Sequence, residues 1–187
     1  MNFQEKVCQV LEEARNLLAT LPEERVQTLF DALSGEWRTR RLFFWARGRS
    51  FLVLQGFAMR LMHLGFEVYI VGEATCPAVR PGDILFVASG SGKTSSVVLF
   101  AEKAKSIGAK VVAIVGRRGS PLEDIAHEVI AFSPGEAGKT EQLFVEGGGT
   151  RFENALFIFF DALILALVEG QKEEAYRLMM ERHANLE

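Results

Sequence analysis

The segment 84-ILFVASGSGKTSS-96 joins an apolar run to the start of a helical pattern through a turn rich in glycine and hydroxyl residues. The run Ile84 to Val87 predicts a buried strand, and the apolar residues after position 96 recur at helical spacing. A helix that begins here presents free N–H groups and the positive end of its dipole to an anion. The glycines allow a ligand to approach closely, and the hydroxyls add donors. The turn therefore predicts a binding site for the phosphate end of a small substrate, in preference to a polar connection without a ligand.

The Gly-Lys-Thr sequence at 92–94 also suggests a nucleotide-binding P-loop, whose pattern is G-x-x-x-x-G-K-[ST]. Counting back from Gly92, the first glycine of that pattern would stand at position 87, which is occupied by Val87. The pattern is incomplete, and we do not expect a nucleotide loop.

Composition limits the function classes that this chain can serve. Its 187 residues suffice for one domain with a full core, and a net charge of −3 argues against nucleic acid as a partner. The most apolar segment, residues 155–168, contains Asp161 and is too short to span a bilayer, so we expect a buried helix and no membrane partner. Cys8 and Cys76 lack metal-ligand spacing, and we expect no metal site. Two free thiols and an acidic N-terminal segment that is no signal peptide predict a cytoplasmic protein.

Strands and helices alternate along the middle of the chain. Such alternation predicts an α/β fold, a three-layer α/β/α sandwich whose five-stranded parallel sheet has the flavodoxin-like order 2-1-3-4-5. The expected strands are residues 40–46, 67–71, 84–88, 110–115 and 129–132. The expected helices between them start near Phe51, near residue 95 and after Pro121, and two end at Gly65 and Gly108.

The flanking segments are helical in pattern. We expect a single domain over 1–187, with N-terminal helices in 1–36, the α/β core in 37–170 and a C-terminal helical tail in 171–187. The second N-terminal helix is expected to open with a capping box of Thr20 and Glu23 and to close near Gly35. A long helix is expected from about Thr150 to Gly170. The glycine-containing loop 133–149 before it is long for a compact domain, which favours a part in the site.

In this strand order a crevice opens between the first and third strands, at their carboxyl ends. Residues 47–50, which include Arg49 and Ser50, would meet residues 89–94 there. The other arginines of this region, Arg38, Arg40 and Arg41, are expected on a solvated strand edge. Two turns with hydroxyl groups thus converge on one place in the predicted fold.

Glu153 is the carboxylate that the pattern singles out, because it follows three glycines at a helix start and lies among phenylalanines. One interpretation is a general base in a partly apolar pocket. The other is a capping box formed with Thr150, which by itself favours glutamate at this position. Of the three histidines, His63 and His127 are expected to be structural, whereas His183 lies in a polar tail that is either solvated or reaches a neighbouring subunit.

Several motifs carry a family resemblance. They are Gly48-Arg49-Ser50, 57-FAMRLMHLGF-66, Ser89-Gly90-Ser91-Gly92 with Thr94-Ser95-Ser96, 101-AEKAKSIGA-109, Gly149-Thr150-x-Phe152-Glu153 and 182-RHANLE-187. With them the chain resembles the sugar isomerase (SIS) domain family, and within it the 6-phospho-3-hexuloisomerases, over nearly its whole length.

The resemblance implies an enzyme that interconverts D-arabino-hex-3-ulose 6-phosphate and D-fructose 6-phosphate. It implies a homotetramer that acts beside 3-hexulose-6-phosphate synthase in the ribulose monophosphate pathway of formaldehyde fixation. It also implies substrate contacts from Arg49, Ser50 and the turn Ser89, Gly90, Ser91, Gly92, Lys93 and Thr94. Glu153 would be the base that acts through a 2,3-enediol(ate), assisted by His183 of a neighbouring subunit, with no metal or redox cofactor.

Three positions depart from the family pattern. Lys93 replaces the usual glutamate, and Arg47 and Phe51 replace small residues beside Gly-Arg-Ser. Two other functions therefore stay open at this point. One is a non-catalytic SIS module that senses a sugar phosphate, and the other is a 1,2-aldose–ketose phosphate isomerase on the same scaffold.

Overall fold

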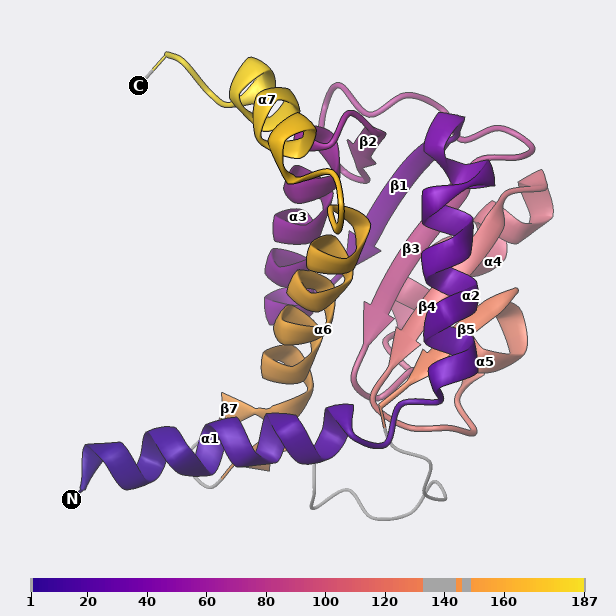
Figure 1. Ribbon diagram of the computed structural model, residues 1–187. Helices are drawn as coiled ribbons and strands as arrows, with labels where there is room; N and C mark the ends of the chain where they lie inside the picture. Colours follow the sequence, from indigo (N-terminus) through magenta and orange to yellow (C-terminus); the bar gives the residue numbers. More distant parts are fainter. Residues whose placement is uncertain (1, 133–143, 146–148, 187) are drawn as a thin grey trace.

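The computed structural model describes residues 2–132, 144–145 and 149–186, and it contains a parallel sheet covered by helices on both faces (Figure 1). The five strands are β1 (Arg41–Ala46), β2 (Glu67–Ile70), β3 (Ile84–Ser89), β4 (Lys110–Val115) and β5 (Glu128–Ala131). They are ordered β2-β1-β3-β4-β5, and every pair in the sheet is parallel. This order confirms the predicted three-layer α/β/α fold. The direction in which successive strands are added reverses between β1 and β3, which is where ligands bind in such sheets.

The helices divide between the two faces of the sheet. They are α1 (Phe3–Leu18), α2 (Glu23–Ser34), α3 (Gly48–His63), α4 (Ser95–Ile107), α5 (Pro121–Ile125), α6 (Arg151–Leu167) and α7 (Lys172–Arg182), with a 3₁₀ helix η1 (Glu36–Thr39) before β1. Residues of α2, α3 and α6 form one core with the sheet, and residues of α4 and α5 form the other. A short antiparallel pair, β6 (Phe144–Val145) and β7 (Gly149–Thr150), precedes α6. Other residues of the predicted loop 133–149 lie outside the described part of the chain.

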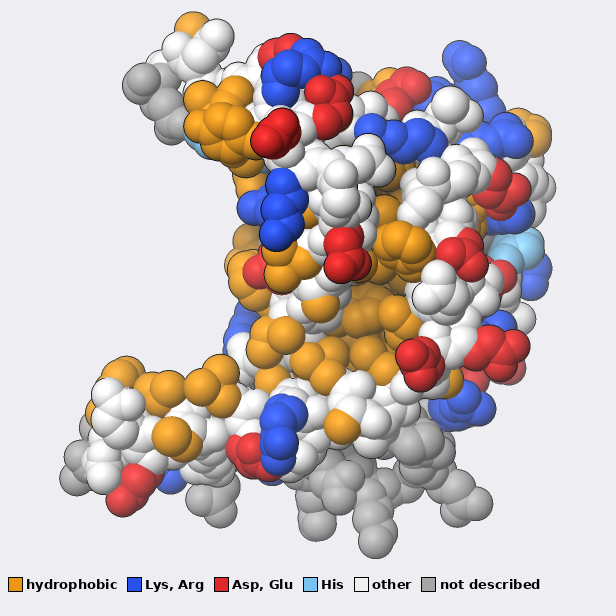
Figure 2. All heavy atoms as spheres, in the orientation of Figure 1, with side chains coloured by type: hydrophobic (Ala, Val, Ile, Leu, Met, Phe, Trp, Pro, Cys, Tyr) orange, Lys and Arg blue, Asp and Glu red, His pale blue; other side chains and the backbone are white. Residues whose placement is uncertain are grey.

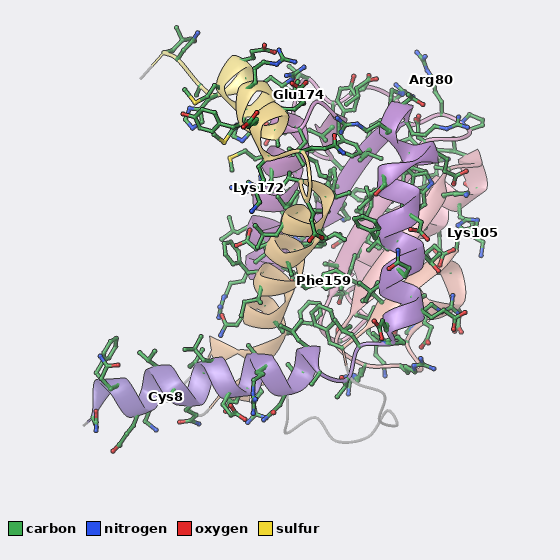
Figure 3. All side chains as sticks on the ribbon, viewed as in Figure 1. Cys8, Arg80, Lys105, Phe159, Lys172 and Glu174 are labelled. Carbon is green, nitrogen blue, oxygen red and sulfur yellow. The ribbon has the colours of Figure 1, made fainter. Side chains whose placement is uncertain are left out.

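Both cores follow from the alternation of side chains along buried strands. On the α3/α6 face, Phe44 stacks on Phe86 with ring centroids 5.2 Å apart, and Phe57 of α3 stacks on Phe160 of α6 at 4.0 Å. Figure 3 shows Phe159 reaching from α6 toward the sheet, where its ring meets Phe132 at 5.5 Å. These aromatic contacts fix how α3 and α6 lie on the sheet, and both helices contribute site residues.

Two helix starts differ from their predictions. Helix α3 begins at Gly48 rather than near Phe51, because Gly48 takes a positive φ of 57° and lets the chain turn directly from β1 into the helix. Thr20 does not cap α2, whose N-cap is Pro22 without a side-chain hydrogen bond. The Thr20 hydroxyl instead lies 2.6 Å from the carbonyl oxygen of Phe132, which a sequence pattern cannot reveal across 112 residues.

Two of the three arginines that were expected on a solvated strand edge, Arg38 and Arg41, are instead held by specific contacts. Arg41 forms a two-point contact with Asp83, with Nε–Oδ1 and Nη2–Oδ2 distances of 3.0 and 2.5 Å. Asp83 also accepts a hydrogen bond from the N–H of Arg80 at 2.6 Å. Arg38 donates to the carbonyl oxygen of Leu64 at 2.6 Å and lies over the ring of Phe66. These two arginines therefore tie the amino end of β1 to its neighbours.

The apolar segment of α6 is only partly buried, which corrects the expectation of a fully buried helix. Phe157, Ile158 and Leu165 keep 53, 39 and 65% of their surface exposed. Helix α1 extends from the body with Phe3 and Leu11 likewise exposed, and Cys8 on the same helix is exposed too. Figure 2 shows apolar side chains in the hollow above α1 and along the face of α6. An apolar groove there is lined by Leu18, Leu21, Val26, Gln27, Phe30, Ile158, Phe159, Ala162, Leu163 and Ala166.

A membrane-spanning segment would need a longer apolar helix than any that the described residues form.

Candidate active site

The predicted phosphate turn is held together by its own hydroxyl groups. The Oγ atom of Ser89 lies 3.0 Å from Oγ1 of Thr94 and 3.4 Å from Oγ of Ser91. It also accepts a hydrogen bond from the N–H of Gly92 at 3.1 Å, and Ser91 Oγ accepts one from the N–H of Lys93 at 3.2 Å. The turn is thus folded before any ligand binds, and binding does not have to order it.

The start of α4 offers unpaired donors at this turn. Thr94 is the N-cap residue, but its side chain makes no capping hydrogen bond because Oγ1 faces Ser89 instead. Among the described residues, the N–H groups of Ser95 and Ser96 have no hydrogen-bond acceptor. Two N–H groups and the positive helix end are the arrangement that binds a phosphate group. The side chain of Lys93 is exposed beside them.

The connection between β4 and α5 packs against the phosphate turn and fixes its backbone. Gly92 has a positive φ of 64°, and a side chain there would collide with Ser120. The N–H of Gly116 donates to the carbonyl oxygen of Gly90 at 3.2 Å, and a Cβ atom on Gly116 would lie 2.6 Å from that oxygen. Both positions require glycine, because Gly92 lies against the buried side chain of Ser120 and Gly116 lies against the backbone of Gly90. The turn therefore keeps one shape.

Two residues from distant parts of the chain form the second half of the site. Oγ of Ser50, in the first turn of α3, donates to Oε1 of Glu153 in the first turn of α6 at 3.0 Å. The adjacent residues repeat the link, with Arg49 Nη2 donating to Asn154 Oδ1 at 3.3 Å. These contacts place the N-terminal ends of α3 and α6 side by side at the carboxyl end of β1. The partner of Arg49, Asn154, was not predicted from the sequence, although it follows Glu153 directly.

Phe152 joins the two halves. Its side chain is 1% exposed, and a Cβ atom on Gly90 would lie 3.3 Å from its Cδ1 atom. The ring also packs against Phe132 at the end of β5. Phe152 thus connects the first turn of α6, which carries Glu153, to the phosphate turn. Residues 47–50 and 89–94 therefore converge as predicted.

The environment of Glu153 bears on its two interpretations. Its described hydrogen bond comes from Ser50, so Oε1 serves a link between helices. Its Oε2 atom is buried and has no hydrogen-bond partner among the described residues. A buried carboxylate oxygen without a donor costs stability and calls for a functional explanation. The side chain of Thr150 lies outside the described part, so the capping box stays a prediction.

The histidines do not gather at this site within one chain. His183 stacks on His63 at the C-terminal end of α3, with ring centroids 5.4 Å apart, whereas Glu153 lies beside the opposite end of that helix (Figure 1). Burial lowers the pKa of His63, and the nearby His183 and Arg60 lower it further. His127 is structural, as expected, because its Nδ1 atom accepts the N–H of Val111 at 3.0 Å. A role for His183 at Glu153 requires a neighbouring subunit.

Two departures from the family pattern find a place in the structure. Phe51 packs edge-on against Trp45, with 5.3 Å between ring centroids, so its ring packs against the core beside the site. The guanidinium of Arg47 lies 6.0 Å from the Trp45 ring. The indole N–H of Trp45 donates to the carbonyl oxygen of Ser96 at 3.3 Å, which connects β1 to the start of α4. Sequence reasoning missed this role of Trp45, whose only signal was its place near the end of the first strand.

Groups of three or more histidine, cysteine, aspartate or glutamate residues that could hold a metal ion are not found within the described ranges. The donors at the site are hydroxyl and backbone N–H groups, which suit an anionic, hydroxylated ligand.

Comparison with known proteins agrees with this geometry. The SIS domain family matches residues 37–151, which include β1, the phosphate turn and the first residue of α6. The chain belongs to the SIS domain family. A 3-hexulose-6-phosphate isomerase from Bacillus subtilis is 35% identical over 100% of both chains. One from Mycobacterium gastri is 43% identical over 79% of this chain and 74% of the relative.

A solved structure of similar fold covers almost the whole SIS chain. It is a protein from Methanococcus jannaschii for which a molecular function of 3-hexulose-6-phosphate isomerase was inferred. It has a TM-score of 0.78 and 34% identity, and the match covers 98% of this chain and 99% of the other. The expected resemblance to SIS-type hexulose-phosphate isomerases is therefore confirmed.

Proposed function

We propose that the protein is a 3-hexulose-6-phosphate isomerase, which interconverts D-arabino-hex-3-ulose 6-phosphate and D-fructose 6-phosphate. The observation that carries this proposal is the pairing of a preformed anion-binding turn with a partly buried carboxylate. Relatives named for this activity, at 35–43% identity over most of the chain, support the choice of substrate. The proposal includes a place in the ribulose monophosphate pathway beside 3-hexulose-6-phosphate synthase, as the family resemblance implies.

In this proposal the phosphate group binds the turn Ser89–Thr94 and the first N–H groups of α4. Lys93 adds a positive charge beside the phosphate, in place of the glutamate usual in the family. The sugar chain then extends toward Ser50 and Glu153. Arg49 contributes indirectly, because its hydrogen bond to Asn154 holds the first turns of α3 and α6 together.

Glu153 is the proposed base. The reaction moves a carbonyl group between C3 and C2, and one carboxylate above both carbons can remove a proton from one and return it to the other. The intermediate is a 2,3-enediol(ate). The oxidation of one carbon balances the reduction of the other, so no external oxidant or reductant is needed, and the Oε2 atom, which has no partner among the described residues, is a suitable acceptor for the carbon-bound proton.

A homotetramer is part of the proposal. The exposed apolar side chains of α1 and α6 and the groove between α2 and α6 would be covered by other copies (Figure 2). Association would also let the tail of one copy bring His183 to the Glu153 of another.

Proton NMR of fructose 6-phosphate with the protein in D₂O tests the function. We expect the C3 proton signal to decrease while a 3-ketose phosphate appears. Exchange at C1 instead would identify a 1,2-isomerase, and binding without any exchange would identify a sugar-phosphate sensor. Either of these two results would refute the proposed activity.

A further inference from the structure

Ser50 and Glu153 share a hydrogen bond whose direction limits what Ser50 can do. An ionised carboxylate only accepts hydrogen bonds, so at the 3.0 Å contact the Ser50 hydroxyl is the donor. A hydroxyl group has one proton and two lone pairs. While its proton points at Glu153, Ser50 can offer only a lone pair to a ligand.

The direction of the Ser50–Glu153 hydrogen bond determines which substrate group can bind to Ser50. Phosphate oxygens and a ketone oxygen are acceptors, and neither can bind to a lone pair. A substrate hydroxyl can, because it donates. The side chain of Ser50 is 6% exposed, so few other groups reach it. The resting site is therefore set to accept a hydrogen bond from a substrate hydroxyl next to the carbon from which Glu153 removes a proton.

We propose that Ser50 relays the hydroxyl proton between O2 and O3 of the substrate, while Glu153 moves the carbon-bound proton. This inference rests on the proposed function and adds a catalytic role to a residue otherwise expected only to hold substrate. Proton transfer by Glu153 alone leaves the reaction incomplete, because one oxygen must lose a proton and the other must gain one.

The steps balance in the direction from fructose 6-phosphate. Glu153 Oε2 takes the proton of C3, the C3–H electron pair forms the C2–C3 double bond, and the carbonyl electrons move onto O2. The now neutral Glu153 is a weaker acceptor, so the Ser50 proton turns to the charged O2. Ser50 receives the proton of O3–H at the same time. The negative charge on O3 then forms the C3 carbonyl, and C2 takes the proton from Glu153.

Substitution of Ser50 by alanine separates this role from a structural one. In D₂O with fructose 6-phosphate, the enediolate of Ser50→Ala would still form but would mostly return, taking deuterium at C3. We expect 3-ketose formation to fall by about 10²-fold, and the ratio of C3 deuteration to 3-ketose formation to rise at least about tenfold. Ser50→Thr, which keeps a hydroxyl, should restore the ratio.

Three controls make the outcomes distinct. Ser106→Ala removes an exposed hydroxyl that bonds to the carbonyl oxygen of Lys103 on α4, and should leave both rates unchanged. If Ser50→Ala lowers both rates equally, or lowers neither, the relay is refuted while the isomerase activity stands. If His183→Ala rather than Ser50→Ala raises the ratio, the relay belongs to the neighbouring subunit. A wild-type protein that neither exchanges nor isomerises would refute the proposed function itself.

Discussion

The ring of Phe152 lies against Gly90 so closely that a Cβ atom at position 90 would be 3.3 Å from Cδ1 of the ring. This contact joins the first turn of α6 to the turn after β3. The residue after Phe152 is the proposed base, and Gly90 belongs to the proposed phosphate site. The packing of Phe152, which is 1% exposed, therefore helps to set how the first turn of α6 lies against the phosphate turn.

Replacement of Gly90 by alanine should displace the phosphate turn from Glu153. We expect a loss of about 1–3 kcal/mol in stability from overpacking, because Phe152 is also held by Phe132. We also expect kcat/KM to fall at least about tenfold, since small misplacements at a reacting centre are costly. Urea unfolding and steady-state kinetics measure the two effects.

Gly56→Ala is the matched control for that variant. A Cβ atom at Gly56, inside α3, would meet no heavy atom within 4 Å. We expect unchanged kinetics and a gain of up to about 1 kcal/mol, because alanine favours the helix interior. Equal kinetics for Gly90→Ala and Gly56→Ala would show that the contact with Phe152 does not set the geometry of the site.

Glu153→Gln should abolish turnover while leaving substrate binding nearly intact. The amide keeps the shape of the side chain and can still accept the Ser50 hydrogen bond, but it cannot take a proton from carbon. We expect kcat to fall at least about 10³-fold, with the Kd for fructose 6-phosphate changed by no more than about threefold. Calorimetric titration measures Kd, and Glu102→Gln on α4 is the control. Loss of binding in parallel with turnover would contradict the assignment of Glu153 as the base.

The sequence was sufficient for the fold because the strands are apolar runs, several of which are followed closely by glycine. Strand β4 has the predicted limits of Lys110 and Val115, and α4 ends at Ile107, one residue before the predicted Gly108, which is its C-cap in the left-handed conformation. The contact between Ser50 and Glu153 could not be read from spacing, since 103 residues separate them. Family resemblance brought both residues to the site, but not their hydrogen bond.

The apolar character of α6 was misleading for a physical reason. A helix that is apolar on all sides predicts burial in the core, yet Phe157 and Leu165 are exposed in the single chain. A sequence does not distinguish a surface buried by the rest of its own chain from one available to a second copy. Thr20 was misassigned for a different reason, because its hydroxyl contacts the carbonyl oxygens of Leu17 and Phe132 instead of capping α2.

The Arg41–Asp83 pair should matter for stability and not for catalysis. It lies at the amino end of β1, away from the site, and the side chains are 17 and 9% exposed. Asp83→Asn leaves the Arg41 charge without its partner. We expect a loss of about 2–3 kcal/mol, less than for a fully buried pair because Arg41 keeps some contact with water.

Thermal unfolding and kinetics together check that expectation. The kcat of Asp83→Asn should equal the wild-type value at temperatures where the variant is folded. Glu12→Gln breaks the exposed Arg15–Glu12 pair and should leave the unfolding midpoint unchanged. A midpoint for Asp83→Asn equal to that of Glu12→Gln would mean that the buried pair contributes nothing.

His127 should make the protein less stable in mild acid. Burial lowers its pKa below the ordinary 6.5, with Lys105 and Lys110 lowering it further and Glu128 opposing them. Below pH 6.5 the unfolded chain therefore binds a proton at His127 more readily than the folded chain does. The folding stability that neutral His127 contributes is fully present above pH 6.5, and it is lost as the pH falls from 6.5 through the lower folded-state pKa. Protonation of Nδ1 would also set two donors against each other at the N–H of Val111.

His127→Asn isolates this effect, because the amide oxygen can replace Nδ1 as the acceptor without titrating. We expect the wild type to lose more stability than the variant between pH 7.5 and pH 5.5. The difference should stay well below about 1.4 kcal/mol, the value of one pH unit below the unfolded pKa, because His127 is exposed and solvent screens its charge. Urea unfolding at the two pH values measures it. Since His63 is present in both proteins, its own titration cancels from the comparison, and equal losses would remove His127 from the acid response.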